Sequence, residues 1–521
     1  MNKYTPIIGV EIHVELKTDS KMFCACKNNP DENEPNVNVC EICLAHPGTL
    51  PVPNKKAIIW TAKIAKMLKC EIAKQSKFDR KNYFYPDLPK GYQISQYDQP
   101  IGNRGKIGLD FKLEENAREK AIINITRVHL EEDTAKLIHD KIGNTLVDFN
   151  RAGIPLVEIV SEPDIRSATE AKKYCQELQL IFRYLEVSDA DMEKGHMRCE
   201  ANVSVQETDK IKIKGNSFSP ISGCELNSKV ELKNINSFRN IEKGIKYEIE
   251  RQIKMIEKGE KWLQQTRGWD DKQQKTVWQR NKETSADYRY FPEPDIPPFN
   301  PIEISKNDLL AITLPQENRK RFEQEFGFSE SDAYILTADK QWTAYAENVM
   351  SELEDWLENL PETKSKKRGA VEQINVKKEI ARLCGGWLTS KLMGLMAEKK
   401  MNIADLKIKE ENFAELICLI DAKRVNSTNA LKILQEMLDS NSDKDPTHIM
   451  EEKGYGQIRD EVQLEKVVDQ IIKNYPVQIE QYKAGKEQTM RFLIGMAMKA
   501  TEGGADPIVI EKMLKEKIVK I

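Results

Sequence analysis

Acidic residues recur, most often beside a histidine, in four short stretches of the first half of the sequence. These stretches cover residues 9–13, 129–133, 196–200 and 230–234, with the sequences GVEIH, HLEED, HMRCE and VELKN. Carboxylate oxygens together with an imidazole nitrogen are ligands that suit a Mg²⁺-type ion, and Mg²⁺ in turn suits phosphate chemistry. The residue types therefore predict a metal-assisted site for reactions of phosphates.

Each stretch lies in or next to an alternating run of apolar residues, which is typical of a β-strand. Side chains two residues apart share one face of a strand, so Glu11 and His13 point the same way and Ile12 the other. Charged groups on such a face must be solvated, paired or bound to a cation, because burying them bare is costly.

Taken singly, each stretch fits an ordinary strand with charged side chains facing water. The distribution of the histidines favours a site, because five of the six lie within the first 200 residues: His13, His46, His129, His139 and His196.

Four of the ten cysteines form two close pairs with the spacing C-x-C-x13-C-x2-C, namely Cys24, Cys26, Cys40 and Cys43. Four thiolates complete a tetrahedral Zn²⁺ shell, and the ion substitutes for a core in a loop-rich segment. The other six cysteines are scattered singly, which makes four unrelated thiols the weaker interpretation. We expect a structural zinc ribbon at about residues 22–46, with no open coordination position.

Residues 78–94 interleave aromatic side chains with Arg80, Lys81 and Lys90 in a loop punctuated by prolines. Such a loop could stack nucleic-acid bases and hold phosphates. It could equally be a rigid loop that packs its rings on the core, and the pattern favours neither interpretation.

The composition describes a folded chain of several domains. Its 521 residues exceed one core, and its 80 basic and 83 acidic residues nearly cancel, so any nucleic-acid binding would use local patches. No apolar stretch approaches the roughly 18 residues that span a bilayer, and the N-terminus lacks a signal-peptide pattern. Ten cysteines without such a signal indicate a reducing compartment. We expect a cytoplasmic protein without a membrane partner.

Hydrophobic periodicity predicts the elements that position these residues. We expect strands at 7–16, 197–206 and 229–236, a strand-rich stretch at 106–159, and helices at 53–70, 167–185 and 237–257. Residues 210–228 read as an exposed hairpin or insertion, and residues 265–298 as an irregular segment whose prolines mark a domain border. Helical patterning dominates from residue 307 onward. The chain has no G-x-x-x-x-G-K-[ST] motif, so any nucleotide would not be held by a P-loop.

Seven stretches, in order, resemble the B-subunit family of the aspartyl/glutamyl-tRNA amidotransferases, and the resemblance runs from Ile7 to Leu514. The stretches are 9–13, 78–96, 129–133, 147–164 (VDFNRAGIPLVEIVSEPD), 197–203, 231–238 and 287–298. The resemblance implies an α+β fold: an N-terminal cradle of mainly antiparallel sheet with helices and a small zinc ribbon, then two all-helical domains. The implied domains are the catalytic cradle at 1–298, a helical domain at 299–408 and a helical tail contacting tRNA at 409–521.

The resemblance also implies an activity, a carbon–nitrogen ligation with glutamine as amide donor. Members use ATP and Mg²⁺ to phosphorylate the side-chain carboxylate of Glu or Asp misacylated on tRNA, and ammonia then displaces the phosphate. The products are Gln-tRNA(Gln) or Asn-tRNA(Asn). Members form a heterotrimer with an amidase A subunit, which supplies ammonia, and a small C subunit.

The family's metal positions, which are also the expected catalytic residues, carry over onto Glu11, His13, Glu131, Glu132, Glu200 and Glu231. The four paired cysteines match the zinc-bearing members. Arg80 and Lys90 are candidates for contact with ATP phosphates or the tRNA end, with a plain surface role as the alternative.

The chain departs from the family at three places. The family usually has Asp where this chain has Glu200, the segment 210–228 is longer than expected, and the tail loop at 504–507 lacks the family's lysine.

A non-catalytic scaffold that presents tRNA to a partner amidase is the competing hypothesis. The convergent carboxylates speak against it, because a scaffold does not need them. A stand-alone zinc-ribbon nucleic-acid binder explains only about 30 residues of the chain.

Overall fold

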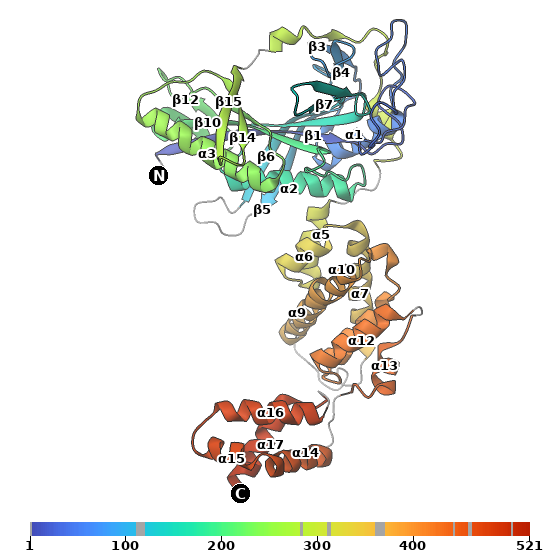
Figure 1. Ribbon diagram of the computed structural model, residues 1–521, viewed down its shortest axis with the longest axis vertical. Helices are drawn as coiled ribbons and strands as arrows, with labels where there is room; N and C mark the ends of the chain where they lie inside the picture. Colours follow the sequence, from blue (N-terminus) through green and yellow to red (C-terminus); the bar gives the residue numbers. More distant parts are fainter. Residues whose placement is uncertain are drawn as a thin grey trace. The chain divides into compact units, whose positions relative to one another are not determined.

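The computed structural model describes residues 3–110, 120–281, 285–309, 314–359, 370–440, 443–456, 461–501 and 504–520. The chain divides into two compact units, Met1–Leu314 and Pro315–Ile521. Figure 1 shows sheet and helices in the first unit and helices in the second. Across the described residues, no helix combines the length and the apolarity that a membrane crossing needs.

A nine-stranded sheet forms the centre of the first unit, in the order β15-β14-β13-β10-β1-β9-β6-β5-β2. Its strands are β1 (Tyr4–Glu15), β2 (Glu71–Ile72), β5 (Gly102–Asp110), β6 (Lys120–Glu132), β9 (Pro155–Ser161), β10 (Met197–Glu207), β13 (Val230–Lys233), β14 (Gln265–Asp270) and β15 (Lys275–Asn281). Neighbouring strands are antiparallel except β13 and β14, between which the chain crosses through helix α3 (Phe238–Glu257). The strand β1 is central, with β9 on one side and β10 on the other.

Helices α1 (Lys55–Met67), α2 (Ala168–Tyr184) and α3 pack against one face of this sheet (Figure 1). The alternation predicted for β1 explains why, because Val10, Ile12 and Val14 are buried toward the core and the residues between them point the other way. Both predicted serine-capped helices are confirmed, since the hydroxyls of Ser167 and Ser237 accept hydrogen bonds from the first turns of α2 and α3.

Three smaller sheets complete the unit. The predicted aromatic loop at 78–94 contains two strands of a three-stranded sheet, β3 (Asp79–Asn82) and β4 (Tyr92–Ser95), joined by β16 (Phe291–Pro292). Strands β7 (Lys136–His139) and β8 (Thr145–Asp148) form one hairpin. Strands β11 (Ile211–Lys214) and β12 (Ser217–Pro220) form another, as predicted for residues 210–228.

The expectation of an irregular segment at 265–298 is wrong in its first part, because β14 and β15 extend the main sheet there. Strand β15 is the edge strand, with one buried residue, Thr276, among mostly exposed ones, so its hydrophobic signal is weak. The compact unit also continues past the predicted border at 298. Phe299 pairs with Ser76 and stacks on Phe78 at 5.5 Å between ring centroids, just before helix α4 (Pro301–Ser305).

The second unit is helical throughout its described part. Its α-helices are α5 (Pro315–Arg321), α6 (Glu330–Leu336), α7 (Lys340–Asn359), α9 (Ala370–Gly386), α10 (Met393–Glu398), α11 (Glu410–Asp421), α12 (Ser427–Asp439), α13 (Pro446–Glu452), α14 (Glu461–Asn474), α15 (Pro476–Lys483), α16 (Gln488–Ala500) and α17 (Pro507–Lys520). One hydrophobic core lies between Phe322 and Met450 and a separate one between Leu464 and Ile518. The α+β class is confirmed, and the division into three domains stays a prediction.

Candidate active site

The register of the central strands places acidic and imidazole side chains on one face of the sheet. Glu11 on β1 lies opposite Glu200 on β10, and His13 lies opposite Glu158 on β9. Glu158 in turn lies opposite His129 on β6. Residues directly opposite each other in an antiparallel pair share a face. These side chains therefore all point away from the helix-covered core.

Two further carboxylates join this face by the same rule. Glu131 follows His129 by two residues on β6. Glu231 on β13 lies opposite Asn202, which follows Glu200 by two residues on β10. Five adjacent strands, β13, β10, β1, β9 and β6, thus contribute to one surface, which we call the acidic face: Glu231, Glu200, Glu11, His13, Glu158, His129 and Glu131.

The centre of the acidic face is close-packed. His13 Nε2 lies 3.4 Å from Glu158 Oε2, 3.7 Å from Glu131 Oε1 and 3.8 Å from Glu11 Oε1. His129 Nε2 lies 3.1 Å from Glu158 and 3.5 Å from Glu131. Glu11, His13 and Glu158 present ligand atoms within 4.8 Å of one another, as do His129, Glu131 and Glu158. Glu158 is common to both groups.

Burial and crowding shift the pKa of the two central β1 side chains. Burial, reinforced by the carboxylate of Glu158, raises the pKa of Glu11 to about 7. Burial lowers the pKa of His13, but the hydrogen bond and charge of Glu158, together with Glu11 and Glu131, outweigh it and raise the pKa to about 9.

The remaining buried groups balance one another's charge. Despite burial, which opposes ionisation, the charge of Glu158 and the hydrogen bond to Glu131 raise the pKa of His129. The pKa of Glu158 is lowered, against burial, by His129 and His13, and that of Glu131 by His129 and Lys81. Protons on imidazoles thus supply positive charge that a divalent cation would supply in their place. The donor set of carboxylate oxygens and imidazole fits such an ion.

Glu200 and Glu231 flank this centre and have partners of their own. Lys233 Nζ lies 2.8 Å from Glu200 Oε2, and the hydroxyl of Thr266 donates to Glu231 at 2.7 Å. The side chain one methylene longer than the family's Asp therefore ends in an ion pair.

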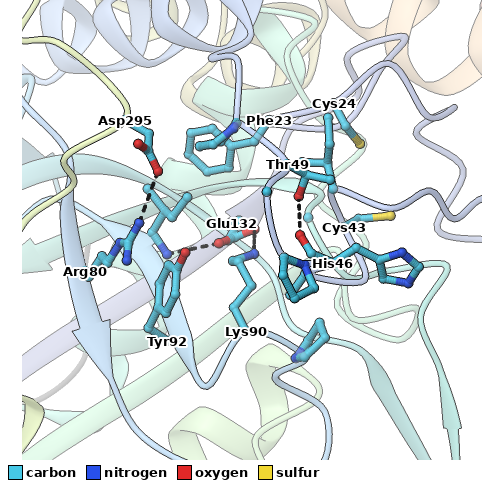
Figure 2. A pocket seen from close by; sticks show the side chains of 18 residues that line it. Phe23, Cys24, Cys43, His46, Thr49, Arg80, Lys90, Tyr92, Glu132 and Asp295 are labelled. Atoms are coloured by element: carbon cyan, nitrogen blue, oxygen red, sulfur yellow. Dashed lines mark hydrogen bonds and ion pairs between the residues drawn. The ribbon is translucent and has the colours of Figure 1, made fainter.

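Glu132 is the predicted ligand that the structure separates from the acidic face. It follows Glu131 on β6 and its side chain meets Lys90 Nζ at 2.8 Å and the backbone N–H of Ile94 at 3.0 Å. Glu132 lines a cavity of about 290 Å³ together with Tyr92 of the small sheet and the loop that carries Cys24 and Cys43 (Figure 2).

Arg80 lines the same cavity, and it also has a partner. Its guanidinium makes two hydrogen bonds to Glu293, at 2.7 and 2.9 Å, and one to Asp295 at 3.3 Å, and it lies 4.3 Å from the ring centroid of Tyr92. Both predicted phosphate-binding side chains, Arg80 and Lys90, are thus held in ion pairs in this structure.

The four cysteines of the predicted zinc ribbon come together. Their sulfur atoms lie within 4.8 Å of one another, and the Sγ atoms of Cys40 and Cys43 are 3.9 Å apart. Thiolates at ~2.3 Å from one tetrahedral ion stand about 3.8 Å apart, so the set fits Zn²⁺. Hydrogen bonds from Cys24 and from the backbone N–H of Cys40 lower the pKa of Cys43 to about 5, whereas burial raises that of Cys26 to about 11.

The sequence argument did not assign Glu158, the central carboxylate, although it quoted the stretch that contains it. Glu158 is the one charged residue in strand β9, between apolar neighbours, and that isolation was an available signal. His129 was noted beside Glu131 without a role. Lys81 was noted in the aromatic loop, and the carboxylates of Glu131 and Glu158 overcome its burial to raise its pKa.

Comparison with known proteins identifies the family. Residues 6–307 match the family model described as GatB/GatE catalytic domain, and residues 370–518 match the one described as GatB domain. A curated relative from Persephonella marina is 41% identical over 519 residues, covering 99% of each chain. Relatives from Crocosphaera subtropica, 40% identical over 530 residues (99% of this chain, 98% of the relative), and Brevibacillus brevis, 41% over 524 residues (99% of each), bear the same name. The chain therefore belongs to the family of aspartyl/glutamyl-tRNA(Asn/Gln) amidotransferase B subunits.

Proposed function

We propose that this chain activates the side-chain carboxylate of Glu or Asp misacylated on tRNA and directs its amidation. A carboxylate oxygen of the substrate attacks the γ-phosphorus of ATP, ADP leaves, and an acyl phosphate forms. Ammonia then attacks the acyl carbon and inorganic phosphate leaves, which gives Gln-tRNA(Gln) or Asn-tRNA(Asn). A carboxylate is a poor acyl donor, and the phosphate supplies the missing leaving group.

The observation that carries this proposal is the convergence of two ligand-competent groups on one shared carboxylate, Glu158, at the centre of the sheet. Phosphoryl transfer needs chiefly charge neutralisation and positioning, and the acidic face offers oxygen and imidazole ligands for both. Mg²⁺ bound there would supply the positive charge that ATP phosphates and the substrate carboxylate require. Glu11, His13 and Glu131 would hold it, each fixed by a strand rather than a loop.

A cavity of about 420 Å³ adjoins Glu11 and supports a ligand at this place. Polar side chains from β9 and β10 line it, among them Ser161, Asn202 and Gln206. Its volume lies in the range of small-molecule sites, and its lining suits a polar ligand. We place the ATP moiety between this cavity and the acidic face.

We further propose the partners and cofactors that the family implies. These are the amidase A subunit, which releases ammonia from glutamine, a small C subunit, the misacylated tRNA, ATP with Mg²⁺, and a structural Zn²⁺ on the four cysteines. Because these reactions serve translation, we place the chain in the cytoplasm.

Glu131→Gln in the reconstituted complex separates this proposal from the scaffold hypothesis. Loss of one buried carboxylate from the acidic face should lower product formation by about 10²-fold or more, while tRNA binding stays within about threefold. Glu41→Gln, an exposed position in the cysteine loop, is the matched control and should be neutral. Full activity of Glu131→Gln would favour the scaffold.

A further inference from the structure

Lys21 is a completely buried lysine next to the cysteine cluster. Its side chain has 0% exposure, and it is among the largest fully buried side chains of the chain. Its backbone belongs to the cysteine loop, because its N–H donates to the carbonyl of Cys26 at 2.9 Å. Lysines are almost never fully buried without a partner for the charge.

No carboxylate among the described residues lies within 4 Å of the Lys21 ammonium. The nearest one in the same cavity wall, Glu132, is paired with Lys90. The ammonium donates one hydrogen bond, to the carbonyl of Phe149 at 3.2 Å. One neutral acceptor does not compensate a buried charge with three donors, so a further anion must be close.

The geometry at Gly153 shows which anion that is. Gly153 has a φ of +85°, and a Cβ placed on it would lie 3.6 Å from Lys21 Cδ, 3.7 Å from Cys43 Cβ and 3.9 Å from Glu132 Oε2. The three side chains therefore meet at one point. The charge of Lys21 also contributes to the low pKa of the Cys43 thiol. A tetrahedral Zn²⁺ with four thiolates carries a net charge of roughly −2, and such a charge needs compensation in a buried setting.

We propose that Lys21 is the buried counter-charge of the four-cysteine metal site and a positioning residue for its ligand Cys43. The inference rests on the proposed zinc site. It adds that metal affinity depends on a side chain that binds no metal. It also explains why a lysine is tolerated at a fully buried position.

The test is metal affinity of the full-length chain, stripped of metal and titrated with Co²⁺ and then with Zn²⁺ against a chromophoric chelator. The absorption bands of Co²⁺ report a tetrahedral thiolate site independently of catalysis. Lys21→Met keeps the length of the side chain and removes the charge. We expect it to bind one ion with an unchanged spectrum and with about 10- to 100-fold lower affinity. Lys27→Met, next to Cys26 but exposed, is the matched control and should stay within about twofold.

A double-mutant cycle distinguishes charge from packing. Cys26→His replaces a thiolate by a neutral imidazole and makes the site less negative, so Lys21→Met should cost clearly less affinity in that background than in the wild type. Equal losses in both backgrounds, or no loss in the wild type, would overturn the inference and leave the zinc site standing. A wild-type chain that binds no metal would overturn both. If Lys21→Met does not fold, Lys21→Arg decides, because it retains the charge and must retain wild-type affinity.

Discussion

At the scale of single residues, Glu158 is the carboxylate on which the acidic face depends. It contacts both histidines, His13 at 3.4 Å and His129 at 3.1 Å, and it belongs to both groups of ligands. Glu158→Gln keeps the shape and removes the charge. We expect phosphoryl transfer to fall by about 10²-fold or more. Steady-state ATP hydrolysis by the assembled complex measures it, with Glu162→Gln, just past the end of the same strand, as control. Activity of the Glu158→Gln complex that stays close to that of the control contradicts the assignment.

Two pKa shifts on β1 predict how stability depends on pH. Glu11 with a pKa of about 7 and His13 with a pKa of about 9 both bind protons more tightly in the folded chain than at their ordinary values. Their protonated forms therefore stabilise the fold at low pH, and that stabilisation is lost as pH rises through about 7 to 9.

A divalent cation should replace those protons, so Mg²⁺ should raise the melting temperature of the metal-free chain more at about pH 8.5 than at about pH 5.5. Calorimetry at both pH values checks this, and Glu11→Gln should reduce the difference. An Mg²⁺ effect that is equal at both pH values, or larger at the acidic one, would count against metal binding at this face.

Much of the acidic face was predictable from alternation alone, and its limits have a physical cause. Spacing by two placed Glu11 with His13, and the same rule separates Glu132 from Glu131, because neighbours in a strand point to opposite faces. Which strands lie side by side was not predictable, since β9 reaches β1 and β6 only through long-range pairing. The pairing of Glu200 with Lys233 likewise depends on the register between β10 and β13.

At the scale of elements, the small sheet of β3, β4 and β16 is anchored by a buried ion pair. The carboxylate of Glu293 has 0% side-chain exposure and accepts both hydrogen bonds from Arg80. Arg80→Met leaves that buried charge unpaired and should destabilise the chain by about 3–5 kcal/mol. Arg104→Met breaks an exposed pair with Glu71, at 77% and 65% exposure, and should cost at most about 1 kcal/mol. Chemical denaturation measures both, and equal costs would mean that Arg80 has no structural role.

The predicted elements were confirmed where a cap or a long periodic run marks them, as for α2 and α3 with Ser167 and Ser237. Strands β14 and β15 escaped prediction because an edge strand buries little and carries polar residues on its exposed side. Their place in the sheet follows from the crossover through α3, which no local pattern reveals.

At the scale of the whole molecule, the last helices have a hydrophobic core of their own. Residues from Leu464 to Ile518 form one cluster, and residues from Phe322 to Met450 form another. A chain ending at residue 456 should therefore keep both remaining cores folded, with circular dichroism lower only by the helices removed. Because the family's tail contacts tRNA, the truncated complex should show a higher KM for tRNA. Aggregation, or loss of the sheet signal, would show that the tail is not a separate domain.

The central claim is that the acidic face forms an acyl phosphate on the misacylated amino acid. The measurement is ATP hydrolysis by the reconstituted three-subunit complex with Mg²⁺ and no amide donor. It compares Glu-tRNA(Gln), Asp-tRNA(Asn) and uncharged tRNA, with the Glu158→Gln complex alongside. We predict hydrolysis stimulated by a misacylated tRNA and not by the uncharged one, because the acyl phosphate forms and then decays in water. Stimulation must be absent from the Glu158→Gln complex. No stimulation of the wild-type complex by either charged tRNA would contradict the account.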